Sequence, residues 1–480
     1  MKKLCLSLIT LIAAFDPVVF AQSKPNVVMI VVDDLNDWVG AMKGHPSAKT
    51  PNIDRLAAQG MLFTNAHCQA PICGPSRASM LTGLYPHRTG NYAQMNDEDI
   101  RRSNEASAAA VFLPDVFEKN GYKTLGVGKI FHNGDKAKVF DTYGGNFDKY
   151  GPSPEKRFKY DPSSFPGKSG GTQTDWGVYP EYDSLMTDHK SAAWAVRQLQ
   201  QTHEKPFMLT VGFYRPHVPW YLPKKWFDLF PLSDITTPPY DPSDMLDVPA
   251  MGKRVSDVPM MPATDWLIST NQWKDVVQAY LASMAFVDAQ VGKVLDALEQ
   301  SPYATNTIVV LLSDHGYHLG EKNRVAKQAL WERDTHVPLI IRQPRGRSNV
   351  VCKAPVQLID IYPTLASLCA LKMDHSVDGH SLQPLLNDPA ASWKHPAMTF
   401  YGVGNVSIRD ERYRLIQYED GSEELYDLEK DANEWNNLAG KKEASKRIMA
   451  LRAFIPKAWA PSSPFVTYPA NAYFKEKYGK

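Results

Sequence analysis

The chain alternates short apolar runs with longer amphipathic stretches along most of its length. Four runs rich in β-branched residues have the length and composition of buried strands, at 26–32, 122–127, 207–213 and 307–313. Residues 274–300 instead carry apolar side chains at helical spacing and predict one long amphipathic helix. Strands that alternate with helices in this way indicate one doubly wound α/β domain around a parallel sheet.

The pattern changes beyond about residue 390, where aromatic-rich segments alternate apolar and polar positions. These segments predict a small antiparallel sheet, with strands inside 397–403, 406–418 and 423–431. A terminal helix is expected near 441–452, so we expect an α/β domain over 22–390 and a smaller C-terminal subdomain over 391–480. Pro- and Gly-rich stretches at 151–170 and 215–263 predict long surface loops.

Polar side chains follow each of the four predicted strands. In chain order they are Asp33 and Asp34, then Lys129 and His132, then His217, then Asp314 and His315. Open α/β sheets bind their ligands outside the carboxyl ends of the strands. The sequence therefore predicts that acids, bases and cations from four strand ends meet at one edge of the sheet.

The three carboxylates of this set indicate a metal site. Asp33, Asp34 and Asp314 offer hard oxygen ligands, which suit calcium, or magnesium as the alternative, better than zinc. His315 would complete the site. A single Asp after a strand is more often the N-cap of the next helix. Two such pairs at separate strand ends favour the metal.

Composition and charge narrow the class of protein. A formal net charge of +1 over 480 residues excludes a nucleic-acid partner, and 43% hydrophobic residues describe an ordinary globular chain. Residues 1–21 combine Lys2 and Lys3 with an apolar stretch and a small Ala21, which predicts a signal peptide and export to the periplasm or beyond. Asp16 interrupts the apolar stretch, so no membrane span is expected.

Few cysteines remain after such a signal peptide, so the protein is not built on disulfides. Cys352 and Cys369 could pair, but a sequence does not fix connectivity. Cys73 stands in APICGPSRASMLTG, directly ahead of a helix-compatible run. Sulfur is a poor ligand for a calcium site of oxygen donors. The position becomes coherent if Cys73 is oxidised to an aldehyde, whose hydrate has one hydroxyl to bind the metal and one to attack.

The segment CGPSRASMLTG matches the C-x-P-S-R pattern and resembles the type I sulfatases, in which this Cys is converted to formylglycine. VVDDLN, TPNIDRLA, GYKTLGVGKIFH, SDHGYHLGE and ELYDLEKDANEWNNLA are also similar to that family. The resemblance implies an alkaline-phosphatase-like doubly wound mixed sheet flanked by helices, with a smaller C-terminal antiparallel sheet. The Asp314-His315 pair, GKIFH and RPHVP resemble the branch of iduronate-2-sulfatase and its bacterial polysaccharide-sulfatase relatives.

The resemblance also implies roles for individual residues. Calcium would be held by Asp33, Asp34, Asp314, His315 and the modified Cys73. The sulfate would be surrounded by Arg77, Lys129 and Lys327, with His132 beside the nucleophile and His217 facing the leaving oxygen. The register of the loop that carries Lys327 does not follow from the family pattern alone.

The expected activity is hydrolysis of sulfate esters, with exo action on 2-O-sulfated sugars from sulfated polysaccharides. The expected partners are that sulfated oligosaccharide and a formylglycine-generating maturation enzyme. Two alternatives stay open: a phosphate or phosphonate monoesterase of the same superfamily, and a non-catalytic protein that binds sulfated glycans with an unmodified Cys73.

Overall fold

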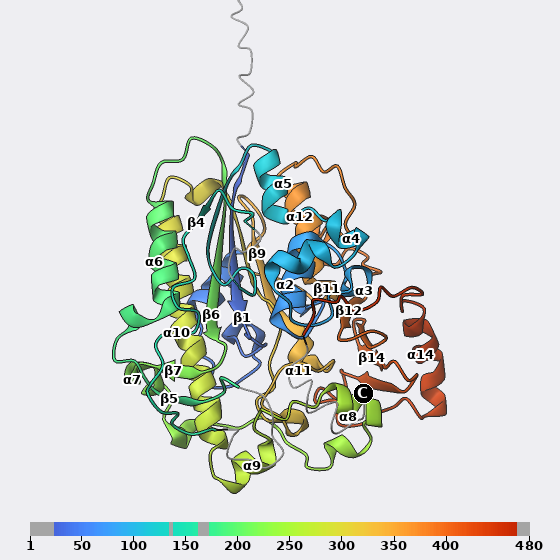
Figure 1. Cartoon of the computed structure of the whole chain (residues 1–480). Helices are drawn as coiled ribbons and strands as arrows, with labels where there is room; N and C mark the ends of the chain where they lie inside the picture. Colours follow the sequence, from blue (N-terminus) through green and yellow to red (C-terminus); the bar gives the residue numbers. More distant parts are fainter. Residues whose placement is uncertain (1–23, 134–137, 162–171, 468–480) are drawn as a thin grey trace, which may run out of the picture.

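The computed structural model describes residues 24–133, 138–161 and 172–467, and a nine-stranded mixed sheet forms its centre (Figure 1). Eight of the strands follow the order β10-β2-β9-β8-β1-β6-β3-β4, and β11 pairs with β2. Their bounds are β1 Asn26–Asp33, β2 Met61–His67, β3 Lys123–Gly128, β4 Thr142–Tyr143, β6 Phe207–Pro216, β8 Thr307–Ser313, β9 His336–Arg342, β10 Val350–Cys352 and β11 Val356–Gln357. The expected signal peptide lies outside the described residues.

Strand β1 shows why this sheet is central. All eight of its residues are buried, as expected for a strand covered on both faces. Val28, Ile30 and Val32 point into one hydrophobic core, whereas Val27 and Met29 point with Val31 into a second core on the other face. The four strands predicted from the sequence are β3, β6, β1 and β8, and they lie next to one another in parallel.

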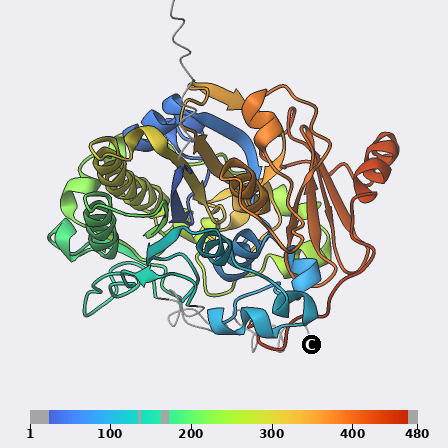
Figure 2. The same ribbon diagram turned by 90° about the horizontal axis from the view of Figure 1, so that it is seen from above.

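Helices cover both faces of the sheet, which gives the three layers visible in Figure 2. One core packs against α1 (Pro51–Gln59), α6 (Thr187–Leu199) and α10 (Trp273–Glu299). The other packs against α2 (Cys73–Thr82), α5 (Leu113–Lys119), α12 (Ile361–Leu368) and α13 (Gln383–Asn387). Helix α10 confirms the long amphipathic helix that the sequence predicts at 274–300. The remaining short helices are α3 Pro86–Thr89, α4 Glu105–Ala108, α7 Lys224–Phe227, α8 Ala250–Val255, α9 Thr264–Ser269 and α11 Glu332–Thr335.

The sheet is not parallel throughout, which corrects the expectation from the hydrophobic pattern. Strand β9 runs antiparallel to both of its neighbours, β8 and β2. Parallel strands need a crossover connection that returns the chain to the starting edge. Between Ser313 and His336 the chain instead stays at the carboxyl edge in an irregular loop with short helical turns. This loop carries Asp314, His315 and Lys327.

The C-terminal part forms a second sheet, as predicted. Strands β12 (Ala397–Phe400), β13 (Val406–Arg409), β14 (Tyr413–Gln417) and β15 (Glu423–Asp427) make an antiparallel meander. Helix α14 (Ser445–Arg452) packs on it through Ile448 and Leu451. The predicted small antiparallel sheet with a terminal helix is therefore confirmed.

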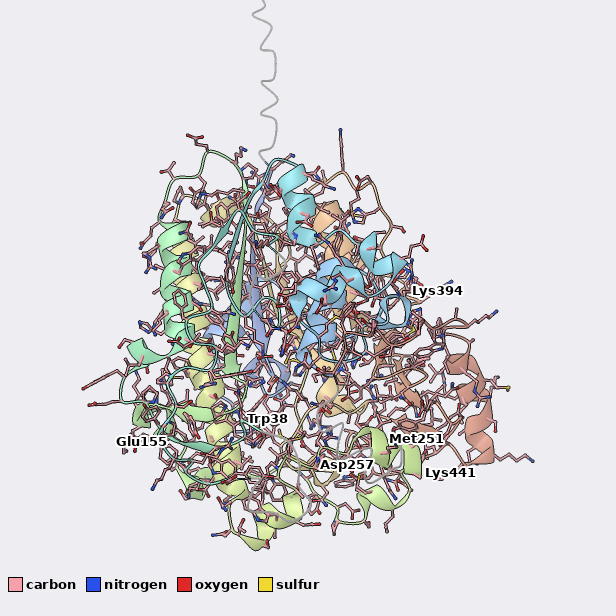
Figure 3. The ribbon with its side chains drawn as sticks, in the orientation of Figure 1. Trp38, Glu155, Met251, Asp257, Lys394 and Lys441 are labelled. Carbon is pink, nitrogen blue, oxygen red and sulfur yellow. The ribbon has the colours of Figure 1, made fainter. Side chains whose placement is uncertain are left out.

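The stretch at 215–263 is more structured than the predicted surface loop. Strand β7 (Trp220–Leu222) pairs with β5 (Trp176–Val178), and α7 and α8 follow. Trp220 and Leu222 are fully buried, so apolar side chains anchor a segment whose many prolines suggested a loop. Met251 and Asp257 mark this segment in Figure 3, below the carboxyl ends of the strands. Part of the other predicted loop, 162–171, lies outside the described residues.

Two further expectations concern cysteines and membranes. Cys68, Cys73, Cys352 and Cys369 are all buried and free, so Cys352 and Cys369 do not form a disulfide in the structure. Among the described helices, none combines the length and the hydropathy needed to cross a membrane.

Candidate functional site

The ends of β1 and β8 bring four of the predicted metal ligands together. Val32 pairs with Ser313, so Asp33 and Asp34 leave the sheet beside Asp314 and His315. The backbone N–H of Asp34 donates to Asp314 Oδ1 at 3.2 Å, and the N–H of His315 donates to the same oxygen at 3.0 Å. Two strand ends are thus joined through one carboxylate.

A bulge in β1 adds the end of β6. The register shifts between Val32 and Asp33, and Asp33 pairs with Pro216 instead of the residue that regular pairing would give. Bulges commonly redirect side chains beside functional sites. Here the shift places His217 next to the carboxylates, where one ring nitrogen lies within 4.8 Å of candidate ligand atoms of Asp33, Asp34 and Cys73.

Cys73 is the first residue of α2 and its side chain is fully buried. Ile72, directly before it, is in an extended conformation, so the helix begins at Cys73. Ser76, one turn later, donates its hydroxyl to the backbone oxygen of Asp314. This bond links the start of α2 to the end of β8.

Four side chains converge on the Cys73 sulfur. His315 Nε2 lies 3.2 Å from Sγ, Lys327 Nζ 3.1 Å and Lys129 Nζ 3.6 Å, and the ring of His132 is also close to the sulfur. Burial raises the pKa of the Cys73 thiol, but the charges of Lys129, Lys327 and His315 outweigh it and hold that pKa well below the ordinary value. The position therefore favours a negatively charged group.

Each cation of the site also pairs with a carboxylate. Lys129 contacts Asp33 Oδ2, and Lys327 Nζ lies 2.7 Å from Asp34 Oδ1. Burial raises the pKa of Asp33, yet the charge of Lys129 and the neighbouring cations bring it well below the usual range. Burial lowers the pKa of Lys327, but the opposed charges raise it overall. Both lysines therefore stay charged at neutral pH.

Arg77 lies behind the carboxylates. Its Nε is 2.8 Å from Asp314 Oδ2 and its Nη2 is 3.5 Å from Asp33 Oδ1. Nη1 donates to the backbone oxygens of Lys129 and Ile130. Burial raises the pKa of Asp314 to about 7, although Arg77 opposes that shift. Arg77 is 1% exposed, so it braces the site from the interior.

The donor set fits a divalent cation. Asp33 Oδ1 and Asp34 Oδ2 are buried and have no hydrogen-bond partner. His315 Nδ1 donates to Gly316 O at 2.9 Å, so Nε2 is the ring nitrogen that faces the carboxylates, 3.3 Å from Asp34 Oδ1. Ligand atoms of Asp33, Asp314, His315 and Cys73 lie within 4.8 Å of one another. Buried acceptors that lack donors are costly, so they indicate a bound cation.

The two remaining histidines are both close to the sulfur. His132 donates its backbone N–H to Asp97, its ring is near Cys73, and burial lowers its pKa. His217 donates Nδ1–H to the backbone oxygen of Val218, and its ring stacks on Tyr150 with centroids 5.1 Å apart. Fixing Nδ1 leaves Nε2 of His217 free for proton transfer.

Sequence reasoning missed several residues that shape the site. Asp97 accepts the backbone N–H groups of His132 and Asn133, and Asp188 accepts those of Tyr214 and Arg215 ahead of His217. Burial raises the pKa of each of these two carboxyl groups to about 6. Asp97 stands in the polar run NDEDI, and no local pattern separates it from a surface acid.

Comparison with known proteins adds to this geometry. The family model described as Sulfatase matches residues 25–370, and the model described as N-sulphoglucosamine sulphohydrolase, C-terminal, matches residues 320–458. A sulfatase of Formosa agariphila is 46% identical over 95% of this chain and 90% of its own length. Human iduronate 2-sulfatase is 32% identical over 72% of this chain and 69% of its own length.

Solved structures agree on the fold. A 2-O GAG sulfatase superposes with a TM-score of 0.69 at 23% identity, over 90% of this chain and 91% of the other. At this identity the likeness concerns the fold alone, a mixed sheet with a smaller antiparallel sheet beside it.

Proposed function

This chain belongs to the sulfatase family, and we propose that it removes 2-O-sulfate groups from the ends of sulfated polysaccharide fragments with a formylglycine at position 73 and calcium. The observation that carries the proposal is the surrounding of Cys73 Sγ by two lysines and two histidines above three buried carboxylates. An ordinary thiol needs no such arrangement. A residue that binds a metal and attacks an anionic ester does.

Calcium would be held by the oxygens of Asp33, Asp34 and Asp314 together with His315 Nε2. Magnesium is the alternative, since both ions prefer oxygen ligands. The bound ion would neutralise the buried carboxylates and polarise the sulfate. Arg77 contacts Asp33 and Asp314 and not the sulfur, so we assign it to holding these two carboxylates in place.

Formylglycine at position 73, made by a maturation enzyme, would supply a hydrated aldehyde whose oxygen is the nucleophile. Lys129 and Lys327 both lie close to Cys73 Sγ. We assign them to the sulfate oxygens, where negative charge grows as the ester bond breaks. The ring of His132 is close to position 73, and we assign it to taking up the proton of the attacking group.

His217 would protonate the departing sugar oxygen. Its Nδ1–H is held by Val218 O, so a proton carried on Nε2 points toward the cluster of Asp33, Asp34 and Cys73. A sugar alkoxide is a poor leaving group and needs this proton as the S–O bond breaks. The arrangement therefore separates the base at position 132 from the acid at position 217.

The substrate class follows from the relatives. Human iduronate 2-sulfatase, at 32% identity, is named for a 2-sulfated uronate. The Asp314-His315 pair and the spacing of Lys129 and His132 support the same branch. We therefore propose a 2-sulfated uronate or a similar residue at a chain end. The signal-peptide pattern of residues 1–21 supports action outside the cytoplasm.

The test is to express the chain with and without a formylglycine-generating enzyme. We expect the peptide around Cys73 to be lighter than the thiol form and reactive to carbonyl probes only with that enzyme. Only this form should hydrolyse sulfate esters, and exhaustive chelation should abolish the activity until calcium is restored. Full activity with an unmodified thiol would refute the proposed nucleophile.

The same preparation decides between the alternatives. Nitrophenyl sulfate, nitrophenyl phenylphosphonate and a panel of defined sulfated disaccharides would be assayed side by side. Faster turnover of the phosphonate than of every sulfate would identify a phosphonate monoesterase. Binding of sulfated disaccharides without turnover, at full formylglycine content, would identify a binding protein.

A further inference from the structure

Two residues of one short segment hold both partners of the Cys73–His132 pair. Gln94 Oε1 accepts the backbone N–H of Gly74, the residue directly after Cys73, at 2.8 Å. Asp97, three residues later, accepts the N–H of His132 at 3.0 Å and that of Asn133 at 2.6 Å. Asp97 is 3% exposed, so these bonds are shielded from water.

The fit at Gly74 is close. A Cβ on Gly74 would lie 2.3 Å from Gln94 Oε1, so any larger residue at position 74 would displace the amide oxygen from its present place. The bond also satisfies one of the N–H groups at the start of α2, which have no intrahelical acceptor. Gln94 thereby fixes the turn on which the nucleophile stands.

The segment is in turn held by the last described part of the chain. The N–H of Thr467 donates to Gln94 O at 2.7 Å, and the two residues form an antiparallel bridge. Ser463 N–H donates to Gly90 O at 2.9 Å and Ala460 N–H to His87 O at 2.7 Å. After α14 the chain therefore runs back across the α2–α3 side of the molecule (Figures 1 and 2).

Side chains anchor the same segment. Trp459 stacks on Tyr92 with centroids 6.3 Å apart, and the hydroxyl of Tyr92 donates to Ala460 O at 2.9 Å. The guanidinium of Arg102 lies 4.5 Å from the ring centroid of Phe465, which also packs against the core on the α2 face. Residues 459–467 thus follow loop 87–97 from end to end.

We infer that residues 459–467 form a strap that fixes loop 87–97, and that Gln94 and Asp97 are positioning residues for the reaction at residue 73. The inference rests on the proposed function, because it assigns the nucleophile to residue 73 and the base to His132. A displacement of about 1 Å between reacting groups lowers a rate by up to about 100-fold. The strap therefore makes the C-terminal part a component of the active site.

Kinetics of four variants test the two positioning residues. Gln94→Ala and Asp97→Ala should lower kcat by about 10- to 100-fold on both nitrophenyl sulfate and a sulfated disaccharide, with KM within about twofold. Gln94→Glu keeps an acceptor for Gly74 N–H and should recover most of kcat, and Asp97→Asn should recover part. Rates are divided by the formylglycine content measured by mass spectrometry.

A second pair of variants tests the strap. Thr467→Pro removes the N–H that bonds Gln94 O, whereas Thr467→Val keeps it and loses only the hydroxyl. We expect Thr467→Pro to lower kcat by several-fold to about 10-fold and Thr467→Val to retain most of the rate. Thr467 is exposed and lies outside the named helices and strands, so we expect the core to fold in both variants.

Hydrogen exchange gives a readout that needs no substrate. In Gln94→Ala and Thr467→Pro the amide of Gly74 should exchange at least about 10-fold faster, and in Asp97→Ala the amides of His132 and Asn133 should do so. Amides in β8 should be unchanged. Unchanged exchange at Gly74 in both variants would overturn the strap.

Failure of the inference is distinct from failure of the proposed function. A fully converted wild-type protein without sulfatase activity would refute the proposed function and leave the exchange test in force. An active wild type whose Gln94→Ala and Asp97→Ala variants keep kcat within twofold would overturn the inference alone. A loss of kcat that Gln94→Glu fails to recover would do the same, since a lost acceptor would then not be the cause.

Discussion

Two buried clusters of charged and polar groups both include residues of the loop between β8 and β9. They differ in how many of their polar atoms have a hydrogen-bond partner. The first surrounds Cys73 at the carboxyl edge of the large sheet. The second, here called the Glu424 cluster, consists of Trp331, Tyr418, Glu424 and Tyr426 between the loop and the C-terminal sheet. Both clusters are almost completely shielded from water.

In the Glu424 cluster the carboxylate is saturated. Trp331 Nε1 donates to Glu424 Oε2 at 2.9 Å, and the hydroxyls of Tyr418 and Tyr426 donate to the two oxygens. In the Cys73 cluster, by contrast, Asp33 Oδ1 and Asp34 Oδ2 accept no hydrogen bond, although Arg77 Nη2 lies 3.5 Å from Asp33 Oδ1. A saturated buried network specifies structure, whereas a network with open acceptors is suited to bind something. The comparison separates a structural cluster from a functional one without reference to residue type.

The first test of this distinction compares two buried thiols, Cys73 and Cys68. Cys73→Ala should lower kcat/KM on the order of 10⁴- to 10⁶-fold, because it removes the proposed nucleophile. Cys68→Ala changes a thiol that is equally buried but whose pKa is raised by burial and by nearby carboxylates. It should cost about 1–2 kcal/mol of stability and leave kcat/KM within a few-fold.

Steady-state kinetics and urea unfolding of both variants decide the matter. A large loss of activity in Cys68→Ala at unchanged stability would mean that burial of a thiol, and not its electrostatic surroundings, marks the site.

The next test concerns His217, the proposed general acid. His217→Ala should lower kcat/KM for a sulfated disaccharide by about 10²- to 10⁴-fold and for nitrophenyl sulfate much less, because nitrophenolate leaves without a proton. His132→Ala should affect both substrates alike, since we assign it to the nucleophile. Equal losses for the two substrates in His217→Ala would move that residue from acid catalysis to substrate binding.

The metal gives the third test. Asp34→Asn keeps the size of the side chain but removes one carboxylate, so it should lower kcat by about 10²- to 10³-fold. It should also weaken calcium binding. A ligand at 1,000 times its Kd stabilises a folded protein by about 4 kcal/mol, so the rise in melting temperature on adding calcium should shrink in the variant. Glu424→Gln is the matched control and should keep the full calcium-dependent rise.

Much of the fold followed from local pattern. The strand expected at 307–313 is Thr307–Ser313, and the helix expected at 274–300 is Trp273–Glu299. Both could be predicted because the spacing of apolar residues within a segment depends on that segment alone. The convergence of Asp33, Asp34, Asp314 and His315 followed too, since carboxyl ends of parallel strands share an edge.

The remaining features depend on contacts between distant residues. The antiparallel direction of β9 is set by a loop that never crosses the sheet, and no residue of β9 encodes it. Lys327 reaches Cys73 from 254 positions along the chain, and its role was suggested only by family resemblance. Gln94 and Asp97 act through backbone N–H groups of other segments, which leave no mark in the sequence.

The smallest effect on activity is expected in the Glu424 cluster. Glu424→Gln replaces one acceptor oxygen by an amide donor, so one of the three donors from Trp331, Tyr418 and Tyr426 loses its partner. A buried donor without a partner costs about 1–3 kcal/mol, and the free energy of unfolding in urea should fall by that amount. Trp331 follows Lys327 by only four residues, so kcat should fall slightly, by less than about fivefold, as the lysine loosens. A large loss of kcat with unchanged unfolding would place Glu424 in the active site, and the distinction between saturated and open carboxylates would then fail.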